Sequence, residues 1–142
     1  MQEAENACRR GMTCWVKGDL AKAVARFTES LRLDPSYARA YCNRGSVYCE
    51  QGEFDKAIAD FNQALRLNPR YARALNNRGV AYRKAGQLDK ALADYTAALA
   101  LEPNYAEAYF NRSGLYTRME EPEKAAIDLA RYEGIRLAHS AK

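Results

Sequence analysis

Identical residues return every 34 positions in this chain, and a repeat of this length points to a stack of similar structural units. Five columns of identical residues keep the same phase. They are Gly11, Gly45 and Gly79, then Gly18, Gly52 and Gly86, then Ala23, Ala57 and Ala91, then Pro35, Pro69 and Pro103, and finally Tyr37, Tyr71 and Tyr105. This phase predicts repeats at residues 4–37, 38–71, 72–105 and 106–139, which cover nearly all of the 142 residues.

Each repeat is expected to form two short helices joined by a turn. Apolar residues recur at steps of three and four, which is the spacing of one helix face. In the second repeat, Gly52 separates the two apolar segments, and Pro69 ends the second because proline has no amide hydrogen to donate. The first segment carries Tyr41, Gly45 and Tyr48, and the second carries Phe54, Ala57, Ile58, Phe61 and Leu65. The pattern predicts helical hairpins in which Gly45 and Ala57 allow a close approach.

The columns resemble the tetratricopeptide repeat, whose pattern places aromatic, glycine, alanine and proline residues at matching offsets. The matching residues are Tyr41, Gly45, Tyr48, Ala57, Phe61, Ala64 and Pro69 in the second repeat, and Leu75, Gly79, Tyr82, Ala91, Tyr95, Ala98 and Pro103 in the third. The resemblance implies an all-α fold, a right-handed superhelical solenoid of four helix-turn-helix repeats with eight helices. It also implies a single domain over residues 1–142.

The fourth repeat departs from the pattern. Ser113, Glu120 and Leu137 replace the two glycines and the closing proline. Leucine at positions 31, 65 and 99 forms a column that should face the following repeat, and the fourth repeat has Glu133 there. A charge in this column is typical of a terminal repeat with a polar outer face. We therefore interpret the fourth repeat as a degenerate cap at which the array ends.

Composition and short motifs argue against several classes of protein. No apolar run approaches the roughly 20 residues that span a bilayer, and the N-terminus lacks the basic and apolar segments of a secretory signal. We therefore expect a cytoplasmic protein without a membrane partner. The cysteines show no Cys-x-x-Cys spacing, which favours reduced thiols over disulfides or a zinc site. They are Cys8, Cys14, Cys42 and Cys49.

The sequence also lacks a recognisable catalytic set. It contains no glycine-rich phosphate loop and no Ser-His-Asp arrangement, since His139 is its only histidine. We expect no enzymatic activity, no cofactor and no metal. The fold resemblance instead implies a protein–protein interaction module, an adaptor or scaffold that binds an extended peptide or partner segment in a concave groove.

The resemblance places the groove on the first helix of each hairpin, where one column holds Asn43, Asn77 and Asn111. A side-chain amide offers both a donor and an acceptor, so it can pair with the backbone of an extended peptide of any sequence. We expect these asparagines to form a ladder along the groove. The alternative is that the amides bond to neighbouring helices or face water.

The middle of the groove is expected to be basic, because Arg39, Arg73, Arg83 and Lys84 fall in groove columns, with Glu5 and Glu107 at the two ends. The planar guanidinium makes two parallel hydrogen bonds to a carboxylate. An acidic peptide or a C-terminal carboxylate is therefore the expected ligand. The alternative is a solvated helical face with no specific partner.

Two aromatic residues fall in groove columns, Trp15 in the first repeat and Phe110 in the fourth. Trp15, near Cys8 and Met12, is a candidate for an apolar pocket at one end of the groove. A role in the core or as a terminal cap is an equal alternative. RNA binding along the basic groove is a second function, and it is disfavoured because it would use stacking aromatics, of which the columns supply these two alone. Assembly with copies of itself is the third.

The best-known ligand-binding subgroup of the family grips acidic chaperone tails through Lys, Asn, Asn, Lys and Arg at fixed columns. The corresponding residues here, in one alignment, are Cys8, Met12, Asn43, Arg73 and Asn77. In the alignment one repeat later they are Cys42, Ser46, Asn77, Glu107 and Asn111. Because most of the clamp is missing in both, we do not expect this chain to bind chaperone tails through it.

Overall fold

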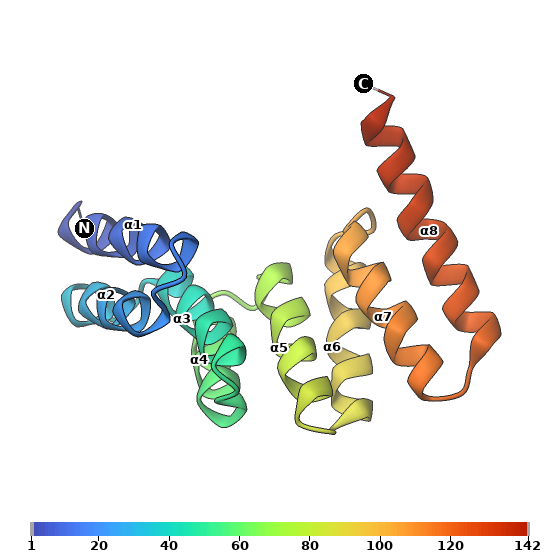
Figure 1. Cartoon of the computed structure of the whole chain (residues 1–142), viewed down its shortest axis with the longest axis horizontal. Helices are drawn as coiled ribbons and strands as arrows, with labels where there is room; N and C mark the ends of the chain where they lie inside the picture. Colours follow the sequence, from blue (N-terminus) through green and yellow to red (C-terminus); the bar gives the residue numbers. More distant parts are fainter. Residues whose placement is uncertain (1, 142) are drawn as a thin grey trace. The chain divides into compact units, whose positions relative to one another are not determined.

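The computed structural model describes residues 2–141, in which the chain forms eight α-helices and no strand (Figure 1). The helices are α1 (Gln2–Val16), α2 (Leu20–Leu33), α3 (Ala38–Glu50), α4 (Phe54–Leu67), α5 (Ala72–Lys84), α6 (Leu88–Leu101), α7 (Ala106–Arg118) and α8 (Pro122–Ser140). Each repeat supplies two of them, as the 34-residue period predicts. The all-helical fold and the hairpin in each repeat are confirmed.

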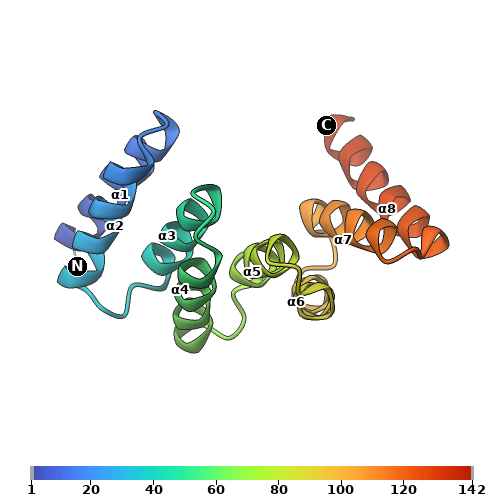
Figure 2. The same cartoon turned by 60° about the horizontal axis from the view of Figure 1, so that its bottom comes forward.

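Internal contacts divide the chain into two compact units, Met1–Ala74 and Leu75–Lys142. The first contains α1 to α4 and the start of α5, and the second contains the rest of α5 with α6 to α8. Figure 2 shows the paired helices from a second direction. That all four repeats act as a single domain stays a prediction.

A close approach of two helices explains why glycine recurs in the first helix of the first three repeats. A Cβ built on Gly45 would lie 2.8 Å from the Phe61 ring, and one on Gly79 would lie 2.6 Å from the Tyr95 ring. Both rings are fully buried. The aromatic column and the glycine column therefore depend on each other.

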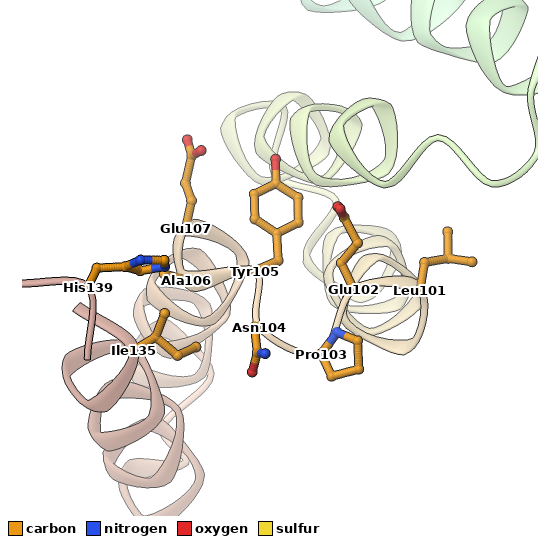
Figure 3. A pocket seen from close by; sticks show the side chains of 9 residues that line it. All are labelled: Leu101, Glu102, Pro103, Asn104, Tyr105, Ala106, Glu107, Ile135 and His139. Carbon is orange, nitrogen blue, oxygen red and sulfur yellow. The ribbon is translucent and has the colours of Figure 1, made fainter. Parts of the chain in front are cut away.

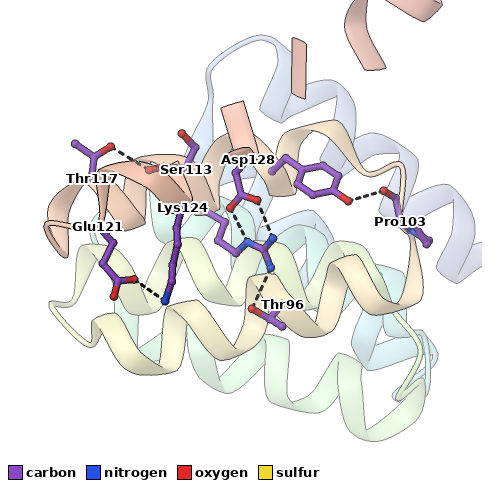
Figure 4. A network of polar contacts seen from close by, with 9 residues as sticks. Thr96, Pro103, Ser113, Thr117, Glu121, Lys124 and Asp128 are labelled. Atoms are coloured by element: carbon purple, nitrogen blue, oxygen red, sulfur yellow. Dashed lines mark hydrogen bonds and ion pairs between the residues drawn. The ribbon is translucent and has the colours of Figure 1, made fainter. Parts of the chain in front are cut away.

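A buried ion pair joins the two helices in each of the last three repeats. Arg112 donates from Nε and Nη2 to the two carboxylate oxygens of Asp128 at 2.7 and 2.8 Å, and from Nη1 to Thr96 at 3.3 Å (Figure 4). Thr96 lies on α6, so this guanidinium also ties the hairpin to the preceding repeat. The other two pairs are Arg44 with Asp60, and Arg78 with Asp94.

The arginines of these pairs also lie near tyrosine rings, at 5.6 to 5.9 Å from the ring centroids. Arg44, for example, lies between Tyr41 and Tyr48.

The first repeat has Arg26 where the others have aspartate, opposite Arg10. Its hairpin therefore lacks this ion pair.

The leucine column packs against the next repeat, as expected. Leu31 is buried in a cluster with Ala40 and Val47 of α3, and Leu99 is buried with residues of α7. Glu133, in the same column of α8, is exposed. That the fourth repeat is a degenerate cap stays a prediction.

The turn inside the fourth hairpin contains a left-handed residue that is not glycine. Gly18, Gly52 and Gly86 have φ values of 82°, 78° and 86°, and Glu120 has a φ of 61° at the same place. A side chain in this region costs roughly 1–2 kcal/mol, partly offset by the extra freedom that glycine loses on folding. We expect Glu120→Gly to raise the free energy of unfolding by about 0.5–1 kcal/mol in urea melts.

Glu123→Gly is the matched control for that variant, because Glu123 lies in the first turn of α8. Glycine in a helix costs about 0.5–1 kcal/mol relative to alanine. The control should therefore lose stability. If Glu120→Gly also lost stability, the backbone strain assigned to Glu120 would be wrong.

None of the helices in residues 2–141 is both long enough and apolar enough to cross a membrane. The same residues contain no group of three or more His, Cys, Asp or Glu side chains placed to hold a metal ion. The structure has no disulfide at Cys8, Cys14, Cys42 or Cys49.

The four cysteines differ in exposure, and this difference predicts an order of reaction. Cys14 is half-buried, whereas Cys8, Cys42 and Cys49 are buried. Alkylation without reductant should modify Cys14 first in the folded protein and all four cysteines after denaturation, as followed by mass spectrometry. Fewer than four modifications in denaturant would reveal a disulfide and contradict the thiol assignment.

Candidate functional site

A pocket of about 450 Å³ opens on the first helices of the first unit. Cys8 is buried there, whereas Arg9 and Arg39 are exposed. Trp15, expected as a candidate pocket residue with Cys8 and Met12, does not line this pocket. The lining residues are Glu5, Cys8, Arg9, Met12, Tyr37 and Arg39.

Two half-buried tyrosines lie beside buried cysteines near the basic face that carries Arg9 and Arg39. The Tyr37 hydroxyl is hydrogen-bonded to the Cys8 thiol, and the Tyr71 hydroxyl to the Cys42 thiol. Burial raises the pKa of Cys8, while a hydrogen bond from Asn43 and the charge of Arg39 oppose the shift. We infer that the exposed guanidinium of Arg39 lies close to this tyrosine–cysteine pair.

Arg73 joins the same face through the second pair. Burial, followed by the neighbouring Cys42, raises the pKa of Tyr71, whereas the charges of Arg73 and Arg39 lower it. Both guanidiniums therefore act on one hydroxyl. Because Arg39 and Arg73 are exposed, the first unit presents two cations to solvent.

Asn43 corrects the expectation of an exposed amide ladder. Its side chain is fully buried, and Nδ2 donates to the Cys8 sulfur at 3.7 Å. Its buried Oδ1 has no hydrogen-bond partner. The preceding repeat covers the Asn43 side chain. Its amide therefore bonds to a neighbouring helix, which is the alternative to a peptide-binding ladder.

Asn77 and Asn111, the expected ladder residues of the second unit, are half-buried. Asn111 donates from Nδ2 to Asn76 Oδ1 at 3.1 Å, and Asn76 donates to Asn77 Oδ1 at 3.3 Å. Asn76 is fully buried and was not among the expected site residues. The amides thus form a network between α5 and α7, and whether Asn77 and Asn111 also contact a peptide stays a prediction.

Trp15 lies against the core of the first hairpin. Its ring meets Phe27 edge-on with centroids 6.5 Å apart, and Nε1 donates to Glu50 Oε1 at 2.9 Å. This indole therefore fastens the C-terminal end of α1 to that of α3. The structure thus gives Trp15 the core contacts of the alternative role.

A second basic cluster lies at the C-terminal ends of α5 and α7. Lys84 is exposed, and Arg83 is half-buried with an unbonded, buried Nε. Arg118 reaches the Arg83 backbone oxygen at 3.5 Å. The structure thus adds Arg118 to the two expected cations, Arg83 and Lys84. Arg118 lies in the column of Lys84, one repeat later, and this position in the sequence could have predicted its place in the cluster.

Phe110, the remaining expected residue, is 52% exposed, and its ring packs at a tilt on Tyr132 of α8 with centroids 4.9 Å apart. In the second and third repeats the position of Tyr132 is alanine. The aromatic pair is therefore particular to the last hairpin.

Several solved structures share this fold. The crystal structure of MamA is 24% identical, covers 98% of this chain and 81% of its own, and superposes with a TM-score of 0.87. The TPR domain of Arabidopsis OM64 is 27% identical over 82% of this chain and 97% of its own, with a TM-score of 0.80.

The first TPR of Spaghetti (RPAP3), solved with the HSP90 peptide SRMEEVD bound, is 30% identical over 91% of this chain and 94% of its own, with a TM-score of 0.74. No curated protein matches the sequence.

Family models match the repeats themselves. A TPR repeat model matches residues 16–52 and 45–86, and a tetratricopeptide repeat model matches residues 72–105. The matched segments are continuous from residue 16 to residue 105, which is more than half of the chain. With the paired helices and the interdependent glycine and aromatic columns, these matches show that the chain belongs to the tetratricopeptide repeat family.

Proposed function

We propose that this chain is a non-catalytic interaction module whose first unit binds an extended acidic peptide through Arg39 and Arg73. The fold neighbours support an interaction module in general, since one of them holds a peptide. The choice of an acidic ligand comes from the charges of this chain.

The proposal rests on the exposure of the Arg39 and Arg73 side chains and on their lack of partners. Both are exposed, and in the described residues neither guanidinium makes a hydrogen bond or an ion pair. A guanidinium binds a carboxylate through two parallel hydrogen bonds, which places the acidic group and orients it. Arg9 adds a third exposed cation at the pocket, next to Glu5.

The burial of Asn43 changes what the peptide backbone can contact. With its donor on Cys8 and no exposed surface, this amide does not reach a ligand in the present arrangement. Recognition in the first unit therefore depends on charge and on the apolar wall that Met12 provides. We propose that Asn77 and Asn111 supply backbone contacts in the second unit.

Acidic peptides should bind by charge and not by a chaperone-tail clamp. Cys8 and Met12 stand where the clamp has Lys and Asn, and Cys8 is buried. We expect the peptide SRMEEVD and a scrambled peptide of the same composition to bind equally. A tenfold preference for SRMEEVD would contradict the exclusion of the clamp.

The test of the proposal is the affinity of the scrambled peptide for Arg39→Ala, Arg73→Ala and the double variant, measured by titration calorimetry. Each exposed charge contact is worth up to about 1 kcal/mol, so each single variant should weaken binding up to about fivefold. The salt dependence should also flatten, because the attraction is screened.

Arg70→Ala is the matched control for these variants. Arg70 is exposed and lies in the turn before α5, outside the groove columns. It should bind the peptide like the wild type. If the double variant kept wild-type affinity as well, this basic face would not be the acidic-peptide site.

A further inference from the structure

A pocket of about 660 Å³ in the second unit has a different charge from the face that holds Arg39 and Arg73. It lies between the turn that joins α6 to α7 and the C-terminal part of α8 (Figure 3). Its lining residues are Leu101, Glu102, Pro103, Asn104, Tyr105, Ala106, Glu107, Ile135 and His139.

The length of α8 builds one wall of this pocket. The second helix of the third repeat, α6, has 14 residues, whereas α8 has 19. Leu137 stands where the other repeats have proline, so α8 continues past this point. His139 reaches the pocket from the part of α8 beyond this point, and Ile135, at the position of Leu101 in α6, lines the pocket just before it. The longer helix of the fourth repeat thus adds His139 to the wall of the pocket.

Two carboxylates give the pocket its charge. In Figure 3, Glu102, Tyr105 and Glu107 extend to the same side of the turn, with the tyrosine ring between the two acids. Both glutamates are exposed, and neither side chain has a hydrogen bond or an ion pair in residues 2–141. Two carboxylates beside an aromatic ring suit a cationic side chain, which gains charge attraction and a contact with the ring.

The corresponding positions in the earlier repeats carry a different set of charges. The column of Glu102 contains Asp34 and Asn68, and the column of Glu107 contains Glu5, Arg39 and Arg73. The two earlier inter-repeat turns are therefore each followed by an arginine at the position where the third turn is followed by Glu107. Only the third turn combines two acids with its tyrosine.

We propose that this pocket binds a lysine or arginine side chain of a partner peptide, together with a neighbouring apolar side chain that packs on Leu101, Pro103 and Ile135. The inference deepens the proposed function, since it rests on the chain being a peptide-binding module. The partner would carry acidic residues for the first unit and a basic residue for this pocket.

The test uses the whole chain labelled with ¹⁵N and the probe peptide acetyl-Leu-Arg-Leu-amide, followed by backbone amide shifts. Shifts should concentrate at residues 101–107 and in the last turns of α8. The same peptide with Gln in place of Arg should bind about three- to tenfold more weakly, as expected for two exposed charge contacts.

The double variant Glu102→Gln/Glu107→Gln should weaken the Arg peptide by a similar factor. Glu123→Gln is the matched control, because Glu123 is exposed on α8 and does not line the pocket. It should bind like the wild type. Thermal melts of both variants would show that the fold is intact.

Equal binding of the Arg and Gln peptides, or no loss in the double glutamate variant, would overturn the inference. Self-association of the wild-type chain that the glutamate variant abolishes, seen by analytical ultracentrifugation, would also overturn it, because the occupant would be a second copy. The titration of the arginine variants with an acidic peptide is a separate experiment. Its failure would contradict the proposed function without changing the results obtained at this pocket, so the two failures can be told apart.

Discussion

Replacing Asp60 by leucine should lower the free energy of unfolding by about 3–5 kcal/mol, because it leaves a buried guanidinium without its counter-charge. Asp60 accepts two hydrogen bonds from Arg44, at 2.8 and 2.7 Å, and the two side chains are 7% and 18% exposed. Contact with Asp60 raises the pKa of Arg44 further. The guanidinium stays charged when its partner is removed, because the ordinary pKa of arginine lies far above neutral pH. Urea or thermal melts measure the loss.

Two further variants separate the buried charge from other effects. Arg44→Met/Asp60→Leu removes both charges and should recover most of the lost stability, as apolar replacements of buried ion pairs do. Glu29→Gln breaks the exposed pair with Arg32 and should leave the melting temperature nearly unchanged. A double variant as unstable as Asp60→Leu would show that packing, and not the unpaired charge, causes the loss.

Replacing Gly79 by leucine should destabilise the second unit by about 3 kcal/mol or more, at or above the upper end of overpacking costs. The new Cβ would lie 2.6 Å from Cε1 of the Tyr95 ring, which is fully buried and has no room to move away. The expected result is a melting temperature lowered by several degrees.

The same substitution at Gly114 is the control. Nothing lies within 4 Å of a Cβ at that position in α7, so Gly114→Leu should keep or raise stability through better helix propensity.

The fourth repeat suggests a rescue, since it has Ser113 in the glycine column and Leu129 in the aromatic column. Gly79→Ser/Tyr95→Leu should be more stable than Gly79→Ser. If Gly79→Leu melted like the wild type, the close contact would be wrong.

The sequence was sufficient to predict the helices because repeated columns report backbone constraints. The glycine and aromatic columns share one contact inside each of the first three hairpins, so their phase determines both helices there. The leucine column likewise indicated which face meets the next repeat, and the burial of Leu31 and Leu99 agrees. These features depend on local spacing, which a sequence displays directly.

The candidate site was less predictable, because side-chain partners depend on packing between repeats. The position of Asn43 on the first helix was expected, but its burial results from the Cys8 region of the preceding repeat. The ion pairs were missed because arginine and aspartate are 16 residues apart, on different helices. The presence of Arg26 in place of aspartate in the first repeat concealed that column further.

The pocket beside α8 could not be deduced from the family pattern, because it arises where the fourth repeat departs from it. Without the closing proline the last helix can continue, and α8 has 19 residues. The place where Ile135 and His139 meet the α6–α7 turn depends on how α7 and α8 pack. The pocket therefore required the three-dimensional structure.

The most direct measurement of the central claim is a map of backbone amide shifts when an acidic peptide is added to the ¹⁵N-labelled chain. The proposed function predicts saturable shifts in α1, α3 and the start of α5, centred on Arg9, Arg39 and Arg73. These shifts should be lost in Arg39→Ala/Arg73→Ala. Saturable shifts confined to α2 and α4 would show that the peptide binds the second helices, and would contradict the claim.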